Sequence, residues 1–151
     1  MFFGGAVSGS VANAVIDRLP IGKSWMTGRS RCDKCKHTLE AADLIPLLSS
    51  VLLGGRCRYC HSTIPYRNLV VEVFLGVGFV LISRIGQIGL MGRIIMAGIL
   101  WVTTVIAVID WETQKIADAM VYLWLVLVAA NGVLIGGLTY QSAMAGLLVG
   151  V

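Results

Sequence analysis

The chain has 151 residues, of which 57% are hydrophobic and only 13% are charged, with a formal net charge of +4. Soluble domains are about 45–50% apolar and about 25% charged, so this composition excludes an ordinary water-soluble domain. The apolar residues are spread over several segments, which a single secretory signal peptide does not explain. The sequence therefore predicts an all-α protein, a polytopic transmembrane helix bundle.

Five apolar stretches are candidates for membrane-spanning helices. They run over residues 1–16, 69–82, 94–109, 119–138 and 143–151. A complete crossing takes about 20 residues, so the first and fifth stretches are short. The fifth is still apolar at Val151, and we expect the chain to be a C-terminally truncated form of a longer protein. An extension past Arg84 toward Gly89 would lengthen the second stretch.

The distribution of charge predicts the orientation in the membrane. Residues 18–68 contain nine of the twelve Lys and Arg residues and three acidic residues, a net charge of +6. Because cytoplasmic loops carry an excess of basic residues, we expect this loop inside and the N-terminus outside. Only Arg84 and Arg93, on the outward link 83–93, run against this pattern. We divide the chain into a first transmembrane helix (1–17), a cytoplasmic domain (18–68) and a membrane domain (69–151), incomplete at its C-terminus.

All four cysteines lie in the basic loop, as the pairs Cys32-Asp-Lys-Cys35 and Cys57-Arg-Tyr-Cys60. Two residues between sulfurs allow both cysteines of a pair to reach one ion, and two pairs complete a tetrahedral site. The spacing between the pairs is close to that of four-cysteine zinc sites. Flanking Lys and Arg residues favour the thiolate form. The sequence predicts a structural metal site, with zinc as the favoured ion, ligated by Cys32, Cys35, Cys57 and Cys60.

Other interpretations of the cysteines remain open at this stage. Disulfides are disfavoured in a reducing cytoplasm, unless the orientation is inverted. An iron–sulfur cluster also takes four cysteines, and a CxxC thiol oxidoreductase is a further possibility. His37 and His61 follow the two pairs and could replace a ligand, although a role beside the ligands is the more common one.

Asp110 follows the unbroken apolar run 94–109 and is expected to end that helix on the cytoplasmic side. From the residues alone, a charge that reaches water at the end of a helix is the favoured interpretation. The alternative is an acid/base carboxylate at the water–lipid boundary, where desolvation raises the pKa of such groups.

The other acidic residues near the helix ends have simple structural interpretations. Asp118, which follows Glu112 and Lys115 in a short polar segment, is expected to cap the next helix or lie in its first turn. Glu72 is interpreted as an interfacial charge near the start of the second stretch.

Small-residue spacings permit close contact between helices. They are Gly5-x-x-x-Gly9, Gly132-x-x-x-Gly136 and Gly146-x-x-x-Gly150, weak signals in a chain with 18 glycines. Asn13, within the first apolar stretch, is expected to hydrogen-bond to a neighbouring helix.

Several segments together resemble the type 4 prepilin peptidases, membrane enzymes of bacterial type IV pilus and type II secretion systems. The resemblance is carried by the first helix and its exit (9–20), the two cysteine segments (29–35 and 55–60), the linker 43–49 and the segment Ile64-Pro-Tyr-Arg67 through Val71-Glu72. It extends over the whole chain and is most specific around the cysteines. The sequence departs from the family at Ile116-Ala-Asp118, where a proline is usual, and at Asn68-Leu69, where Tyr-Pro is usual.

The resemblance implies a function that composition alone does not. Family members remove the basic leader of type IV prepilins or pseudopilins at the cytoplasmic face, and many methylate the new N-terminus with S-adenosylmethionine. Proteolysis in the family uses two membrane-edge aspartates, and Asp110, in Val108-Ile-Asp110, corresponds to the first. With the resemblance, Asp110 is predicted to be catalytic. The expected location is the bacterial inner membrane, and the expected partners are the pilin substrate and the lipid bilayer, with no nucleic acid.

The family's second aspartate lies in a Gly-x-Gly-Asp segment, which occurs nowhere in these 151 residues. Aspartic proteolysis needs two carboxylates that share one proton, one acting as base and the other as acid. We therefore expect this chain alone to be inactive as a protease. The alternative function is a non-proteolytic zinc-binding membrane module, since the +6 loop suits anionic headgroups.

Overall fold

The structure is a computed structural model that describes residues 1–24, 32, 34–38, 40, 53–86, 88–114 and 118–134. Its described part is helical, with the order α1 (Phe2–Arg18), the 3-10 helix η1 (Leu19–Ile21), α3 (Tyr66–Arg84), α4 (Leu90–Thr113) and α5 (Asp118–Leu134). The prediction of a helical protein is therefore confirmed for the described residues.

Four of the five predicted apolar stretches correspond to helices, with shifted ends. The second does not continue toward Gly89, because α3 ends at Arg84 and Ile85 has extended backbone angles. The third is longer than predicted, because α4 continues through Trp111 and Glu112 to Thr113. Asp118 is the first residue of α5, in agreement with a first-turn role. The fifth stretch, the end of the fourth, and the later glycine spacings lie outside the described residues.

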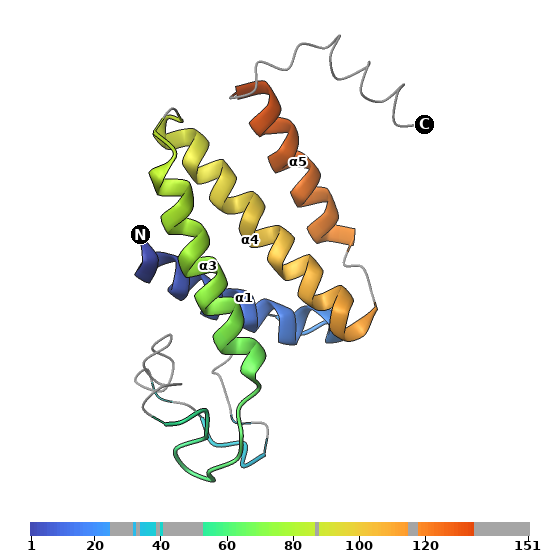
Figure 1. Ribbon diagram of the computed structural model, residues 1–151. Coiled ribbons are helices and arrows are strands. Elements are labelled where there is room, and N and C mark those ends of the chain that lie inside the picture. Colours follow the sequence, from blue (N-terminus) through green and yellow to red (C-terminus); the bar gives the residue numbers. More distant parts are fainter. Residues whose placement is uncertain are drawn as a thin grey trace.

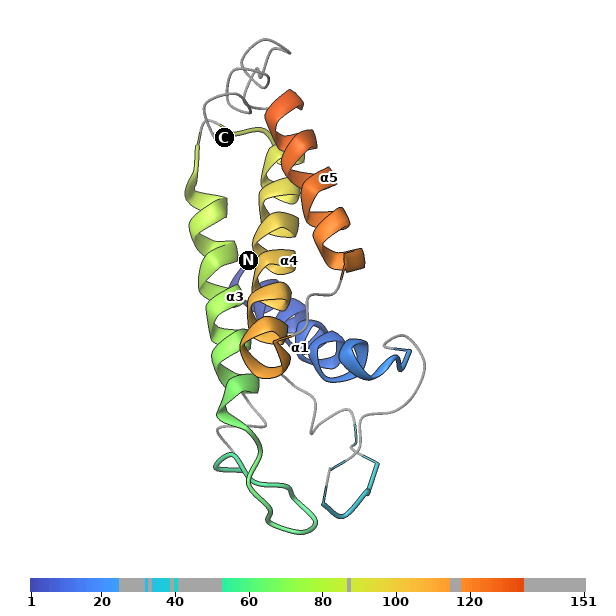
Figure 2. The same cartoon turned by 90° about the vertical axis from the view of Figure 1, so that its right-hand side faces the viewer.

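Within the described ranges, two helices, α3 and α4, are long and apolar enough to cross a membrane. At about 1.5 Å per residue they measure about 28 Å and about 36 Å, against a hydrocarbon core of about 30 Å. They run side by side in opposite directions, and α5 lies next to α4 (Figures 1 and 2). Membrane-spanning length is therefore supported for the second and third predicted stretches.

Helix α1 packs against α3 through glycines. A Cβ added at Gly5 would lie 2.5 Å from the Leu75 carbonyl oxygen, and one added at Gly9 would lie 2.7 Å from Glu72 Cα. Such distances leave no room for a side chain, so the Gly5-x-x-x-Gly9 spacing does bring two helix backbones together. Glu72 is buried under α1, with 8% of its surface exposed. Its interpretation as an interfacial charge did not predict this burial.

The position of α1 differs from that of the two long helices. It crosses α3 obliquely (Figure 1), and the Phe2 ring contacts Gly76, near the middle of α3. The start of α1 therefore lies beside the middle of α3 and not at its far end. That residues 1–17 form a membrane-spanning helix stays a prediction.

The core lies where α1, α3 and α4 meet, near the start of α3. Apolar residues from all three helices form it: Ala12, Val15, Ile16, Val71, Leu75, Val105 and Ile109. Polar contacts join the same helices, since Trp101 Nε1 donates to the Ser8 carbonyl oxygen (2.9 Å) and Asn13 Nδ2 donates to the Asn68 carbonyl oxygen (3.0 Å). The predicted interhelical role of Asn13 is confirmed. The core thus fixes the helix ends that face the cysteine segments (Figure 2).

Candidate functional site

The fold brings the four cysteines together. Their sulfur atoms all lie within 4.8 Å of one another, and Cys32 Sγ lies 3.7 Å from Cys60 Sγ. In a tetrahedral zinc site with bonds of about 2.3 Å, neighbouring sulfurs are about 3.8 Å apart. All four are free thiols, and Cys57 is buried. The four-cysteine cluster predicted from spacing is present, and its dimensions suit one tetrahedral ion.

The two cysteine pairs adopt the same turn. In the first pair, the Cys32 N–H donates to the His37 carbonyl oxygen (3.0 Å), and the Lys36 N–H donates to the Cys32 carbonyl oxygen (2.9 Å). In the second pair, the equivalent bonds join Cys57 to Ser62 (2.8 Å) and His61 to Cys57 (2.9 Å). Lys36 and His61 both have left-handed backbone angles, with φ of 57° and 54°. Each turn points its two sulfurs toward the same centre.

Neither histidine belongs to the sulfur cluster. The His37 ring packs on the Tyr59 ring of the other pair, with centroids 3.8 Å apart. His61 instead occupies the left-handed position of its turn. Sequence reasoning left both histidines open as ligands. Among the residues that the structure describes, the group that could hold a metal ion consists of the four cysteines alone.

Hydrogen bonds give the thiols unequal acidity. The pKa of Cys32 is lowered to about 6, first by the backbone N–H of Cys35 and then by the Ser62 hydroxyl. The pKa of Cys60 is lowered chiefly by the Ser62 hydroxyl, which lies 3.1 Å from its sulfur. For Cys35, the backbone N–H of His37 acts to lower the pKa, but burial and the neighbouring sulfurs outweigh it and raise the pKa to about 11. A bound cation would favour the thiolate at every position.

The second cysteine pair is tied directly to α3. A single-residue β-bridge joins Arg56 and Thr63, and the Ile64 N–H donates to the Gly55 carbonyl oxygen (2.8 Å). Pro65 follows as the N-cap of α3, and its fixed φ suits a helix start. The cysteine cluster is therefore held close to the first turn of α3.

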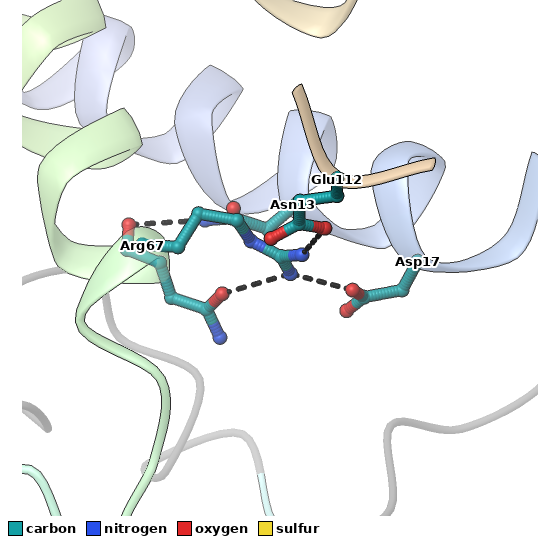
Figure 3. Close-up of polar contacts among 5 residues, drawn as sticks. Asn13, Asp17, Arg67 and Glu112 are labelled. Atoms are coloured by element: carbon teal, nitrogen blue, oxygen red, sulfur yellow. Dashed lines mark hydrogen bonds and ion pairs between the residues drawn. The ribbon is translucent and has the colours of Figure 1, made fainter. Parts of the chain in front are cut away.

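Three helix ends meet in an ionic cluster beside this turn (Figure 3). Arg67, in the first turn of α3, donates to Asp17 Oδ1 of α1 (2.5 Å) and to Glu112 Oε2 of α4 (2.6 Å). It also donates to Asn68 Oδ1 at 3.1 Å. The Arg67 side chain is 19% exposed, so the two carboxylates replace most of its water. We call Asp17, Arg67 and Glu112 the Arg67 cluster.

Sequence reasoning did not identify the Arg67 cluster, although a signal was present. Asp17 and Glu112 lie at helix C-termini and Arg67 lies at a helix N-terminus. Each charge is at the end of its helix where the macrodipole disfavours it. Three charges placed this way indicate partners in other helices, but only the fold identifies those partners.

Asp110 lies in the last turn of α4 and is exposed. The prediction that it ends the helix was wrong, because the helix continues to Thr113 and ends at Gln114, whose backbone is left-handed (φ 51°). The Gln114 N–H donates to the Asp110 carbonyl oxygen at 2.8 Å. Ile109, the preceding residue, is buried in the core, which fixes the direction of the turn.

An apolar groove lies between α3 and α4, on the part of α4 that precedes Asp110. Its volume is about 290 Å³, and it is lined by Val70, Val71, Phe74, Leu100, Thr103, Thr104, Ala107 and Val108. Thr103, Ala107 and Asp110 follow at i, i+4 and i+7, so they share one face of α4, and all three are exposed. Ala107 and Val108, the lining residues closest to Asp110 in sequence, place the groove within about one helical turn of Asp110 along α4.

Comparison with known proteins identifies a family whose sequences are similar to this chain. Residues 3–85 match the sequence model described as "Bacterial Peptidase A24 N-terminal domain". The chain is 34% identical over 167 residues to a "Type 4 prepilin-like proteins leader peptide-processing enzyme" of Escherichia coli O78:H11, covering 97% of this chain and 61% of that protein. It is 42% identical over 79 residues to a "Prepilin leader peptidase/N-methyltransferase" of Myxococcus xanthus, covering 52% of this chain and 24% of that protein.

A third relative is the "Prepilin leader peptidase/N-methyltransferase" of Klebsiella pneumoniae, 33% identical over 128 residues, covering 80% of this chain and 55% of that protein. The chain thus spans at most 61% of the length of these three relatives. No solved structure matches the chain.

Proposed function

The chain belongs to the bacterial peptidase A24 family, and we propose that it serves in a membrane aspartic endopeptidase of the prepilin peptidase type. The substrates would be type IV prepilins or pseudopilins, from which the enzyme removes the basic leader. The family match over residues 3–85 is the observation that carries this proposal, together with relatives whose names include leader peptidase. The resemblance predicted from the sequence is confirmed.

In this proposal Asp110 is one of two catalytic aspartates. It is exposed in the last turn of α4, at the end of the bundle that faces the cysteine segments (Figure 2). In the mechanism, one carboxylate takes a proton from water while a second, protonated carboxyl donates to the leaving group. Since these 151 residues contain no Gly-x-Gly-Asp, they lack the expected second carboxylate. The 151-residue polypeptide alone is therefore expected to cleave nothing.

Exposed aromatic residues support the depth assigned to Asp110. Tyr66, at the start of α3, is 84% exposed, and Trp111, next to Asp110, is 88% exposed. Tyr and Trp are enriched at membrane–water interfaces. Both residues belong to the helix ends beside the cysteine segments, so the Asp110 carboxylate would lie where water meets the headgroups. The location would be the bacterial inner membrane, with the N-terminus outside and the +6 loop in the cytoplasm.

The cysteine cluster would hold a structural zinc ion. Four thiolates would close the coordination sphere, so this ion would stabilise the loop and take no part in proteolysis. Methylation of the new N-terminus with S-adenosylmethionine is proposed only because relatives are named N-methyltransferases.

The test replaces Asp110 with Asn in the longest polypeptide that the reading frame encodes, co-expressed with a prepilin. Cleavage is detected as the change in the gel mobility of the prepilin when it loses its leader. Asp110→Asn is expected to abolish processing, because the amide cannot exchange the proton. Asp118→Asn is the matched control, since Asp118 is an exposed carboxylate in the first turn of α5. Unchanged processing by Asp110→Asn would eliminate its catalytic role.

A non-proteolytic zinc-binding membrane module is the alternative function. The observation that favours it is the net charge of +6 in residues 18–68, which suits anionic lipid better than a basic leader. This alternative expects zinc binding and attachment to anionic vesicles to persist while prepilin stays uncut by every encoded length of the chain.

A further inference from the structure

The Arg67 cluster connects the start of α3 to the turn of α4 that carries Asp110. Glu112 follows Asp110 by two residues, about 200° around the helix, so their side chains leave α4 on nearly opposite faces. The inner face binds Arg67 through Glu112 (2.6 Å), and the outer face exposes Asp110. Fixing Glu112 therefore fixes the rotation of the turn without occupying the Asp110 carboxylate.

The contact between Arg67 and Glu112 acts on the C-terminal turn of α4. The turn is held on one side by buried Ile109 and closed by the bond from the Gln114 N–H to the Asp110 carbonyl oxygen. Beyond Ile109, Glu112 supplies the charged contact between this turn and α3. The second carboxylate on Arg67, Asp17, belongs to α1 and so ties the same guanidinium to a different helix.

The helix macrodipole gives no local reason for these charges. A carboxylate at the C-terminus of α4 and a guanidinium at the N-terminus of α3 each weaken their own helix end. Two charge-assisted hydrogen bonds to one guanidinium offset that loss across helices. The Arg67 Nε atom is buried and has no hydrogen-bond partner among the described residues. The arrangement therefore favours a fixed geometry between helices over the stability of each helix end.

We propose that Arg67, acting through Glu112, is a positioning residue that holds the last turn of α4 and so keeps Asp110 exposed on the opposite face of the helix. The role of Asp110 in this inference rests on the proposed function. The contact by which Arg67 holds the last turn of α4 does not depend on that function. Catalytic geometry is sensitive to such support, since a displacement of about 1 Å lowers rates by about 100-fold.

The first experiment measures hydrogen exchange of residues 108–114 in the 151-residue chain reconstituted in lipid nanodiscs. Glu112→Gln removes the charge on α4 and is expected to accelerate exchange of the last turn by about tenfold. Asp17→Asn is the matched control, because it removes the other carboxylate from the same guanidinium. It is expected to change exchange at these positions by less than about twofold. If Glu112→Gln does not fold, Glu112→Asp is used instead. It keeps the negative charge but shortens the side chain, so it should also accelerate exchange of the last turn.

Two results would overturn the inference. One is unchanged exchange at residues 108–114 in the Glu112 variants. The other is equal acceleration by Asp17→Asn, which would mean that the Arg67 cluster holds the whole end of the bundle and not the Asp110 turn.

The second experiment measures prepilin cleavage by the longest encoded polypeptide. Glu112→Gln and Arg67→Gln are each expected to lower kcat by about 10- to 100-fold with little change in KM. Their double variant should be no slower than either single variant, because both remove one interaction. Arg67→Lys, which keeps a charge, should recover part of the loss.

The two experiments separate this inference from the proposed function. Altered exchange in Glu112→Gln together with normal cleavage by Asp110→Asn would remove the catalytic role and leave the mechanical connection. Loss of cleavage by Asp110→Asn with additive effects of Arg67→Gln and Glu112→Gln would keep the function and overturn the inference.

Discussion

Gly9 of α1 lies directly against Glu72 of α3, so closely that a Cβ on Gly9 would be 2.7 Å from Glu72 Cα. The contact buries an acidic side chain near the start of a helix that is long and apolar enough to cross a membrane. It also places the C-terminal turn of α1 beside Arg67. The fit of this one glycine thus determines where the first helix ends relative to the other two.

Gly9→Ala is expected to destabilise the protein, because the nearest atoms are α3 backbone that cannot rotate away. Overpacking of this kind costs about 1–3 kcal/mol. Gly4→Ala is the control in the same helix, since a Cβ there meets nothing within 4 Å. The control should be neutral or slightly stabilising, because Ala favours a helix by up to about 1 kcal/mol. Thermal unfolding in detergent compares the two, and equal melting temperatures would contradict the contact.

The cysteine cluster is expected to bind about one zinc ion per chain, with four thiols protected from titration. Cys57→Ser should lose the ion, because it removes one of four ligands. His37→Ala should retain it, since the His37 ring packs on Tyr59 and lies outside the sulfur cluster. Metal analysis of the purified variants measures both. Zinc loss in His37→Ala would assign that histidine to the ligand set.

Removing the ion is expected to leave the helices folded. The core of α1, α3 and α4 consists of helix residues, and none of the described residues between Gly22 and Pro65 belongs to it. Circular dichroism after chelation should therefore retain the helical signal, while proteolysis of residues 24–65 accelerates. A cooperative loss of helicity on chelation would show that the ion stabilises the whole bundle.

The thiols of the metal-free chain are expected to react in a fixed order. Thiolates are the reactive species, so at pH 7 Cys32, with a pKa of about 6, is mostly ionised. Cys35, with a pKa of about 11, stays protonated at that pH although it is exposed. Alkylation of Cys32 should rise through about pH 6, and that of Cys35 only in strong alkali. Mass spectrometry of alkylated peptides across pH measures the order.

Ser62→Ala is the control for that order. Because the Ser62 hydroxyl stabilises the thiolates of Cys32 and Cys60, its loss should raise both pKa values and slow their alkylation near neutral pH. Unchanged rates for both residues would remove Ser62 as the cause.

The two ends of α3 are expected on opposite sides of the membrane. Gly86→Cys, in the short link after α3, has open space around it, and Lys23→Cys lies at an exposed position before the cysteine segments. A membrane-impermeant maleimide should label Gly86→Cys in intact spheroplasts and Lys23→Cys only after permeabilisation. The reverse result would invert the orientation and place Asp110 at the outer face.

Composition and spacing were enough to predict much of this protein. A chain with 57% hydrophobic residues and few charges indicates membrane helices. Hydropathy located α1, α3, α4 and the start of α5 to within a few residues. Two CxxC pairs predicted the four-cysteine cluster, because a short spacing restricts both sulfurs to one turn. Helix ends were less predictable. The segment Trp111-Glu112-Thr113 was assigned to a polar link, but it continues α4. Glu112 there binds Arg67 of a neighbouring helix, a contact that hydropathy does not include.

The Arg67 cluster could be identified only from the tertiary structure. Asp17, Arg67 and Glu112 are separated by about 50 residues each along the chain, and no local pattern pairs them. Their pairing follows from the crossing of α1 over α3, which the glycine contact sets, and from the antiparallel course of α3 and α4. Periodicity describes one helix at a time, whereas a charge shared by three helix ends exists only after those helices have packed.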